Sequence, residues 1–217
     1  MEGLDNKPSV IKTESDEDLR LGLKKARQVL LSRGLVAFPT ESFYGLGVNA
    51  LDEEAIGRLF EIKERESSHP VLILIPSQDS LHSYVKEVPK VALELIKRFW
   101  PGGLKLLFEA GPGISRLLTA DTGKIGIRLS SHPVASALVK AMGSPITGTS
   151  ANISGDPGCC RIDDLKPQLA RQLDAVLDAG PLKGGTGSTV VDVTDNMPRI
   201  LRQGEISEKE ILNLIER

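Results

Sequence analysis

The stretch Leu35-Val36-Ala37-Phe38-Pro39 decides the fold of this chain. Four apolar residues ending at a proline are typical of a buried strand, because proline cannot donate a hydrogen bond to a neighbouring strand. An amphipathic helix is predicted directly before it. Ser15 opens that helix with a capping-box-like start, and apolar residues follow at helical spacing up to Gly34. A helix that leads into a buried strand indicates an α/β domain.

The alternation of helices and strands continues along the chain. We predict helices over 53–63, 91–99, 133–142 and 207–215, and strands over 70–75, 104–108, 124–129, 145–149, 175–177, 188–193 and 199–201. Several of these strands are continuously apolar, which is typical of a sheet covered by helices. We therefore expect an α/β fold with one twisted, open, mixed sheet in a single domain over residues 15–217. Residues 1–14 are expected to form a loose arm.

Composition limits the class of protein. A chain of 217 residues can bury a sizeable core without disulfides. Its 27 Lys and Arg against 29 Asp and Glu argue against a constitutive nucleic-acid coat protein, but this balance does not exclude a local basic cleft. No apolar run is long enough to cross a bilayer, and the N-terminus does not resemble a signal peptide, so we expect a cytoplasmic protein. Cys159 and Cys160 are adjacent and the three histidines lie far apart, so we expect neither a disulfide framework nor a metal site.

Three familiar motifs are matched only in part. Residues 45–50, Gly-Leu-Gly-Val-Asn-Ala, fit the dinucleotide fingerprint, but no acidic residue ends a clear second strand, so we interpret them as a glycine-rich bend. Gly123-Lys124 lacks the Ser or Thr that a P-loop needs next. Residues 148–152 end in Asn where a nucleophile elbow needs Gly. These departures argue against a Rossmann site, a P-loop and a serine hydrolase.

Polar segments at the ends of predicted elements are better candidates for a site, because open α/β sheets bind ligands there. Lys63 and Arg65 can clamp a phosphate chain, or they can simply oppose the dipole of the helix before them. Ser150 and Asn152 can bond phosphates, or they can satisfy their own loop. Arg128 ends a strand and can pair with a carboxylate, or it can be a surface charge. The segments are 39–42, 63–65, 149–152 and 186–189.

Several segments, taken in order, resemble the signatures of the YrdC family, and they cover residues 19–204. The best-understood members of that family are threonylcarbamoyl-AMP synthases. The chain resembles the short form of the family, without the further C-terminal domain of longer relatives. The segments are 36–47 (VAFPTESFYGLG), Lys63-x-Arg65, 99–102 (FWPG), 126–128 (GIR) with 132–133 (HP), 150–155 (SANISG), 188–192 (STVVD) and 200–202 (ILR).

The resemblance implies a nucleotidyltransferase reaction. Threonine and bicarbonate give a carbamate, whose carboxylate attacks the α-phosphate of ATP and releases pyrophosphate. The product, threonylcarbamoyl-AMP, serves the threonylcarbamoyladenosine modification of tRNA. Because the carbamate is the nucleophile, the protein supplies only positioning and cancellation of phosphate charge. The resemblance also implies Mg²⁺ bound through the ATP phosphates rather than by the protein.

The same resemblance implies roles for particular residues. Lys63 and Arg65 would act as the catalytic cations on the phosphates, and we expect both to face solvent at the end of their helix. Arg128 would hold the carboxylate of threonine. In full, the implied ATP-binding residues are Lys63, Arg65, Ser150, Asn152 and Arg202, and the implied threonine-binding residues are Thr40, Ser42, Arg128 and Ser188.

The chain departs from the family pattern at five positions. Ser42 stands where many members have Thr, and it keeps the hydroxyl. Lys105 and Lys124 stand where Thr is common, and either could add a phosphate contact or indicate another ligand. Glu66 replaces a usual Pro, and His69 replaces Asn or Lys. These departures bear on the exact substrate.

Two alternative functions remain open at this stage. One is a double-stranded RNA-binding protein without synthase activity, and the other is a divergent paralogue that handles a carbamoyl-adenylate. Aromatic residues are only 4% of the chain, so RNA would be held through backbone charge rather than base stacking. The resemblance also implies tRNA, double-stranded RNA or the tRNA threonylcarbamoyl-transfer complex as partners. The cations that could line an RNA-binding face are Lys63, Arg65, Lys105, Lys124, Arg128, Arg161, Lys183 and Arg202.

Overall fold

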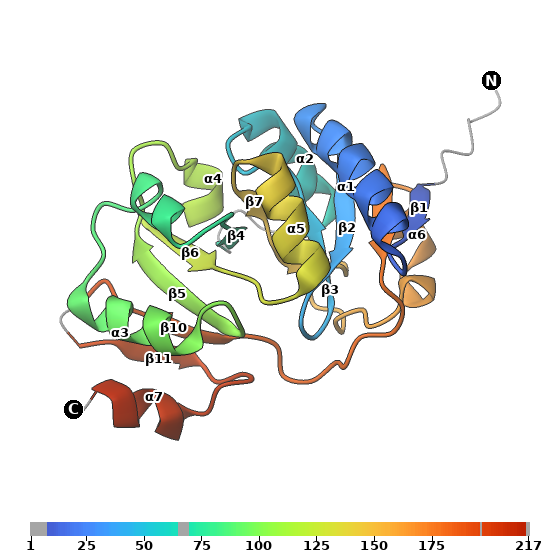
Figure 1. Cartoon of the computed structure of the whole chain (residues 1–217). Coiled ribbons are helices and arrows are strands. Elements are labelled where there is room, and N and C mark those ends of the chain that lie inside the picture. Colours follow the sequence, from blue (N-terminus) through green and yellow to red (C-terminus); the bar gives the residue numbers. More distant parts are fainter. Residues whose placement is uncertain (1–7, 65–69, 196, 216–217) are drawn as a thin grey trace.

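The computed structural model describes residues 8–64, 70–195 and 197–215. It shows a mixed α/β fold in which helices surround two β-sheets (Figure 1). The first sheet has the order β1 (Ser9–Lys12), β9 (Ala175–Asp178), β2 (Val36–Pro39), β3 (Tyr44–Gly47) and β8 (Thr149–Ser150). The second has the order β11 (Arg199–Arg202), β10 (Thr189–Asp192), β5 (Leu104–Glu109), β6 (Lys124–Arg128), β4 (Ile73–Leu74) and β7 (Ile146–Thr147).

The strands divide into two sheets, where the sequence led us to expect one. The predicted strand over 145–149 is split at Gly148, whose N–H donates to the carbonyl of Leu72 over 2.9 Å. Its first part, β7, joins the second sheet, and its last part, β8, joins the first. The sheets stay connected next to this point, because Thr147 and Val48 exchange two hydrogen bonds of 3.0 Å. One hydrophobic core extends through both sheets.

The five predicted helices are present with nearly the predicted bounds, whereas the short helices Arg116–Thr119 and Pro167–Ala170 were not predicted. Ser15 accepts a hydrogen bond from an amide three residues further along, and Ser207 and Glu210 form a reciprocal capping box. One helix begins at Pro133 and ends before Gly143, which has a φ of +71°. The main helices are α1 (Asp16–Leu31), α2 (Glu53–Ile62), α3 (Lys90–Phe99), α4 (Arg116–Thr119), α5 (Pro133–Met142), α6 (Pro167–Ala170) and α7 (Glu208–Ile215), with 3₁₀ turns at Asp79–Ser83 and Ile162–Asp164.

The helices cover the sheets unequally. α1 and α5 lie side by side over one face of the first sheet (Figure 1). Leu30 of α1 and Leu138 of α5 are fully buried there in one cluster with Phe38 and Leu177. α3 and α7 pack together beside the second sheet. No helix in the described part of the chain is both long and apolar enough to span a membrane.

The expectation of a loose arm is wrong for Ser9–Lys12. These residues form β1, which pairs in parallel with β9 at the edge of the first sheet. Lys12 binds the carboxylate of Asp178 over 2.5 Å, and Ile11 packs against the core. A single inward apolar residue leaves too weak a pattern for a strand to be predicted. Residues 1–7 lie outside the described part of the chain, and the domain boundaries stay a prediction.

The glycine-rich bend that we expected at 45–50 is also wrong in its first half. Tyr44–Gly47 is strand β3, antiparallel to both β2 and β8. Its glycines lie against Phe38, and a Cβ at Gly47 would meet the ring at 2.8 Å. The two glycines of the dinucleotide-like motif therefore leave room for the Phe38 ring within the sheet.

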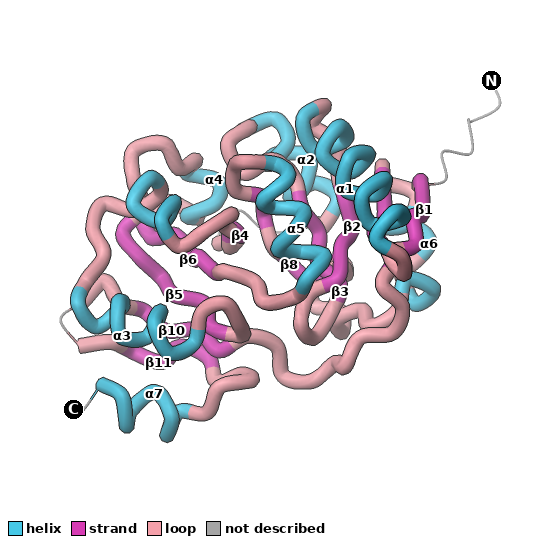
Figure 2. Tube along the Cα trace, in the orientation of Figure 1, coloured by secondary structure: helices cyan, strands magenta, loops and turns pink. Residues whose placement is uncertain are grey.

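A long loop carries the chain from β9 in the first sheet to β10 in the second (Figure 2). Its last residues, Thr186, Gly187 and Ser188, border the cavity described below. The amide of Gly184 in this loop donates to the carbonyl of Ser42 over 2.9 Å. The loop therefore ties the two sheets together along one side of the candidate site.

Candidate functional site

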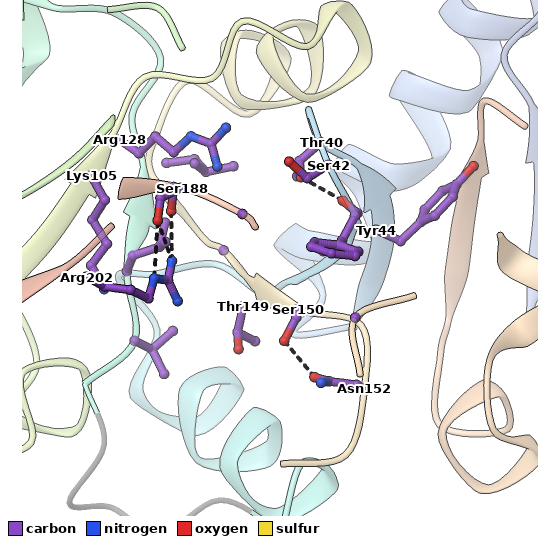
Figure 3. A pocket seen from close by; sticks show the side chains of 18 of the residues that line it. Thr40, Ser42, Tyr44, Lys105, Arg128, Thr149, Ser150, Asn152, Ser188 and Arg202 are labelled. Carbon is purple, nitrogen blue, oxygen red and sulfur yellow. Dashed lines mark hydrogen bonds between the residues drawn. The ribbon is translucent and has the colours of Figure 1, made fainter. Parts of the chain in front are cut away.

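A cavity of about 360 Å³ lies between the two sheets. Thr40 and Ser42, on the loop between β2 and β3, border it from the first sheet, as does Ser150 of β8. Arg128, at the end of β6, and Arg202, at the end of β11, border it from the second. Figure 3 shows Thr40 and Ser42 across the open space from Arg128 and Arg202.

The structure brings most of the predicted site residues together. Lys63 lies under the loop that follows β8 rather than in the lining. Arg65, Glu66 and His69 lie outside the described residues. The predicted residues that line the cavity are Thr40, Ser42, Arg128, Ser150, Asn152, Ser188 and Arg202.

Arg202, at the end of β11, is held in place by Ser188, which directly precedes the neighbouring strand β10. Its guanidinium donates to the Ser188 carbonyl over 2.7 Å and to the Ser188 hydroxyl over 3.2 Å (Figure 3). Burial lowers the pKa of Arg202, and the nearby charge of Arg128 lowers it further. Among the lining residues in the described part of the chain, Asp156 is the only acid, and it pairs with Lys166 over 2.6 Å. This wall of the cavity therefore favours an anion.

Arg128 is a buried residue, so it is not the surface charge that one reading of the sequence allowed. Its Nε donates to the carbonyl of Gly102 over 2.8 Å, and its Nη2 pairs with Glu41. Sequence reasoning did not single out Glu41, although it stands between the two site residues Thr40 and Ser42. Burial raises the pKa of Glu41, but Arg128 and the N–H of Ser131 outweigh this and hold it below its usual value.

Lys63 is also buried, and the expectation that it faces solvent is wrong. Only 1% of the residue is exposed. Its Nζ donates to the carbonyls of Ser150 and Asn152 over 2.6 and 2.8 Å, and to the Asn152 side-chain oxygen over 3.0 Å. In this arrangement Lys63 shapes the loop that borders the cavity.

The polar side chains of that loop bond one another as well as lining the cavity. The Ser150 hydroxyl donates to Oδ1 of Asn152 over 2.6 Å, and Nδ2 of Asn152 donates to the carbonyl of Asp156. Also on the side of the first sheet, the Thr40 hydroxyl donates to the Phe43 carbonyl over 2.6 Å. These bonds fix where each polar group borders the cavity.

The two lysines that depart from the family pattern have different environments. Lys105 lines the cavity on the same wall as Arg202 (Figure 3). Its side chain crosses Gly126, where a Cβ would meet Cε of the lysine at 2.4 Å. Lys124 is absent from the lining and pairs with Asp192 over 2.8 Å. Only the first of these departures concerns the site.

Metal ligands and thiols are not gathered in the described part of the chain. No group of three His, Cys, Asp or Glu side chains there could hold a metal ion. Cys159 and Cys160 are free thiols, and the first donates to the carbonyl of Arg161 over 2.7 Å. Burial raises the pKa of the Cys159 thiol, which disfavours a reactive thiolate. The donors that the lining offers are therefore cations, hydroxyls and amides.

Known proteins place these observations in a family. The Sua5/YciO/YrdC family model, described as "Telomere recombination", matches residues 28–204. The threonylcarbamoyl-AMP synthase of Pyrococcus abyssi is 39% identical over 83% of this chain and 53% of its own length. This chain thus spans about half the length of that curated relative.

Solved structures agree with the sequence comparison. The structure of P. abyssi Sua5 complexed with L-threonine superposes with a TM-score of 0.84 at 34% identity, over 95% of this chain and 60% of that one. E. coli YciO superposes with a TM-score of 0.84 at 28% identity, over 95% of this chain and 100% of that one. The chain belongs to the Sua5/YciO/YrdC family.

Proposed function

We propose that this chain is a threonylcarbamoyl-AMP synthase, which forms threonylcarbamoyl-AMP and pyrophosphate from L-threonine, bicarbonate and ATP. The observation that carries the proposal is the cavity between the sheets. The guanidinium groups of Arg128 and Arg202 on one wall face the hydroxyl groups of Thr40 and Ser42 on the other. A polyphosphate with a small polar amino acid matches that combination of charge and hydrogen-bonding groups. The names of its relatives support the same activity.

Threonine is the substrate whose binding depends most on Arg128. A guanidinium can bond a carboxylate through two parallel N–H groups, and Arg128 borders the cavity at the end of β6. Thr40, Ser42 and Ser188 would bond the amino and hydroxyl groups of threonine. These three side chains lie on both walls, so bound threonine would be enclosed between the sheets.

ATP is proposed to extend from the arginine wall to the loop after β8. Arg202 and Arg65 would hold phosphates, and Ser150 and Asn152 would seat the nucleotide. Lys63 would act on the nucleotide through this loop, because its ammonium already holds the loop carbonyls. We therefore propose that Lys63 supports the loop after β8, in place of the direct contact with phosphate that the family resemblance implied.

The chemistry needs no nucleophile from the protein. The carboxylate of the threonine carbamate attacks the α-phosphate, and the protein holds the two reactants in line and offsets the phosphate charge. Mg²⁺ would enter with ATP and neutralise part of that charge. Asp156 is the only acid in the described lining and pairs with Lys166, which fits a metal held by the nucleotide phosphates rather than by the protein.

The proposal extends to the setting of the reaction. We propose a cytoplasmic protein whose product is passed to the tRNA threonylcarbamoyl-transfer machinery. tRNA or double-stranded RNA would then be met at the next step of the modification and would not be needed for the first. This separation makes the synthase reaction testable without RNA.

The deciding experiment measures pyrophosphate release by the purified protein with ATP and Mg²⁺. We expect release only when threonine and bicarbonate are both present, and no stimulation by RNA. Pyrophosphate release that does not depend on threonine, or the absence of any pyrophosphate release, would overturn the proposal and favour a divergent paralogue. Retention of double-stranded RNA by an inactive protein would favour the RNA-binding alternative.

A further inference from the structure

We propose that Glu41 is a positioning residue, whose carboxylate holds the Arg128 guanidinium so that its free edge faces the threonine site. The inference rests on the proposed function and deepens it. Glu41 stands between Thr40 and Ser42, but its side chain turns away from the cavity lining and pairs with Nη2 of Arg128. The pair therefore joins the β2–β3 loop of one wall to the end of β6 in the other.

The Glu41 carboxylate is fixed by donors other than Arg128. Its Oε1 accepts from the Ser131 amide over 2.6 Å and from the hydroxyls of Ser130 and Ser131, each over 3.0 Å. These donors lie just before α5, and they leave Oε2 for the arginine. To make way for the carboxylate of a substrate, Glu41 would have to give up all three of these hydrogen bonds. Glu41 is therefore a fixed support for Arg128 and not a stand-in for the substrate carboxylate.

One edge of the Arg128 guanidinium bonds the protein, and the other edge is left for the cavity. Its Nε is committed to the Gly102 carbonyl and its Nη2 to Glu41. Nη1 has no hydrogen-bond partner among the described residues, and Arg128 lines the cavity. Because a guanidinium is rigid and planar, two fixed contacts on one edge set the direction of the other edge.

The negative charge of Glu41 also helps to keep Arg128 in position. Arg128 is buried close enough to Arg202 to lower the pKa of that residue. Two buried cations repel each other, and a buried charge is costly without a partner. The Glu41 carboxylate, with only 12% of its side chain exposed, supplies that partner for Arg128. Without this charge, the Gly102 carbonyl would be the partner left to hold Arg128 against its repulsion from Arg202.

The test is steady-state kinetics on Glu41→Gln, which keeps the size of the side chain and one oxygen acceptor but removes the charge. We expect the KM for threonine to rise about tenfold while the KM for ATP stays within about twofold. A loss of folding stability alone would lower the active fraction without moving one KM selectively. Glu109→Gln is the matched control, because it removes the Glu109 charge from the exposed Lys86–Glu109 pair, which is outside the cavity lining, and it should change neither constant.

A milder variant covers the case in which Glu41→Gln does not fold. Ser131→Ala leaves the Glu41 charge in place and removes one of its hydrogen-bond donors. The KM for threonine should then rise about two- to threefold, again without a matching change for ATP. An unchanged or lowered KM for threonine in the folded Glu41 variant would overturn the inference.

A spectroscopic measurement separates this inference from the proposed function. In ¹⁵N-labelled protein, the Nη2–H resonances of Arg128, assigned by their loss in Arg128→Lys, should exchange with water about tenfold faster in Glu41→Gln than in the wild type. Equal exchange in the two proteins would overturn the positioning role whether or not the protein is active. Absence of threonine-dependent pyrophosphate release in the wild type would instead count against the proposed function alone.

Discussion

The Lys63 ammonium lies 2.8 Å from the backbone carbonyl of Asn152, on the inner side of the loop that borders the cavity. The same ammonium donates to the carbonyl of Ser150 over 2.6 Å, so one side chain at the end of α2 holds both the end of β8 and the start of this loop. Hydrogen bonds from a charged donor are stronger than neutral ones, and they gain strength where water is excluded. Lys63 therefore determines the shape of the site through the backbone of its neighbours.

The first prediction concerns the stability that Lys63 provides. Lys63→Ala should lower the free energy of unfolding by about 2–4 kcal/mol, because it leaves buried carbonyl oxygens without their charged donor. Urea denaturation followed by circular dichroism measures the change. Lys86→Ala is the matched control, since its ammonium belongs to an exposed ion pair, and its effect should stay within about 0.5 kcal/mol. Equal stability of the two variants would show that Lys63 is not a support of the fold.

The second prediction concerns Arg128 itself. Arg128→Lys keeps the positive charge but loses the planar fork that bonds Gly102 and Glu41 along one edge and leaves the other edge for a ligand carboxylate. A two-pronged charged contact in a closed pocket contributes roughly 2–4 kcal/mol, so the KM for threonine should rise roughly 30- to 1,000-fold. The KM for ATP should change much less.

Kinetics with threonine varied at saturating ATP and bicarbonate provide the measurement. If the KM for threonine is unchanged in Arg128→Lys, then Arg128 does not bind that substrate. The case for an amino acid as second substrate would then rest on the relatives alone.

The third prediction compares the two lysines that replace a common Thr. Lys105→Thr removes a cation from the cavity lining and should raise the KM for ATP about three- to tenfold, an effect that weakens as salt is added. Lys124→Thr removes a cation that pairs with Asp192 outside the lining, and it should leave both substrate constants unchanged. Initial rates at low and high salt distinguish the two variants. Equal effects of both substitutions on ATP would refute a local role for Lys105.

Local sequence patterns were sufficient to predict much of this fold. The apolar stretch before Pro39 is strand β2, and the capping residues Ser15 and Ser207 begin α1 and α7. Each of these signals lies within a few residues of the element that it defines. Interactions between neighbours in sequence are enough to produce them, so tertiary structure did not override the prediction.

Features that depend on distant contacts could not be predicted in the same way. Lys63 at the end of a helix gives the same local pattern whether its ammonium faces water or carbonyls 87 and 89 residues away. Glu41 meets Arg128 only because two sheets face each other across the cavity. The resemblance to a known family pointed to several residues that line the cavity, but it did not supply these two supporting roles.

The last prediction concerns the acid stability that Asp178 provides. Burial raises the pKa of this carboxyl, but Lys12, the Gly180 amide and the Tyr44 hydroxyl, at 2.5, 2.8 and 3.0 Å, outweigh burial and hold it below the ordinary value of 3.8. The unfolded chain therefore binds a proton more readily than the folded protein. The stabilisation is fully present above pH 3.8 and is lost as the pH falls through the lower folded value. Asp178→Asn cannot titrate, so the stability difference between wild type and variant should stay constant from about pH 6 to about pH 5 and then shrink as the pH falls toward about 3. Urea denaturation at intervals across that range measures it, and Lys12→Ala should show part of the same change because it removes the largest stabilising contact. Parallel curves for the wild type and Asp178→Asn down to the lowest pH would show that folding leaves the proton affinity of this carboxyl unaltered, and the link between β1, β9 and Tyr44 would then contribute no pH-dependent stability.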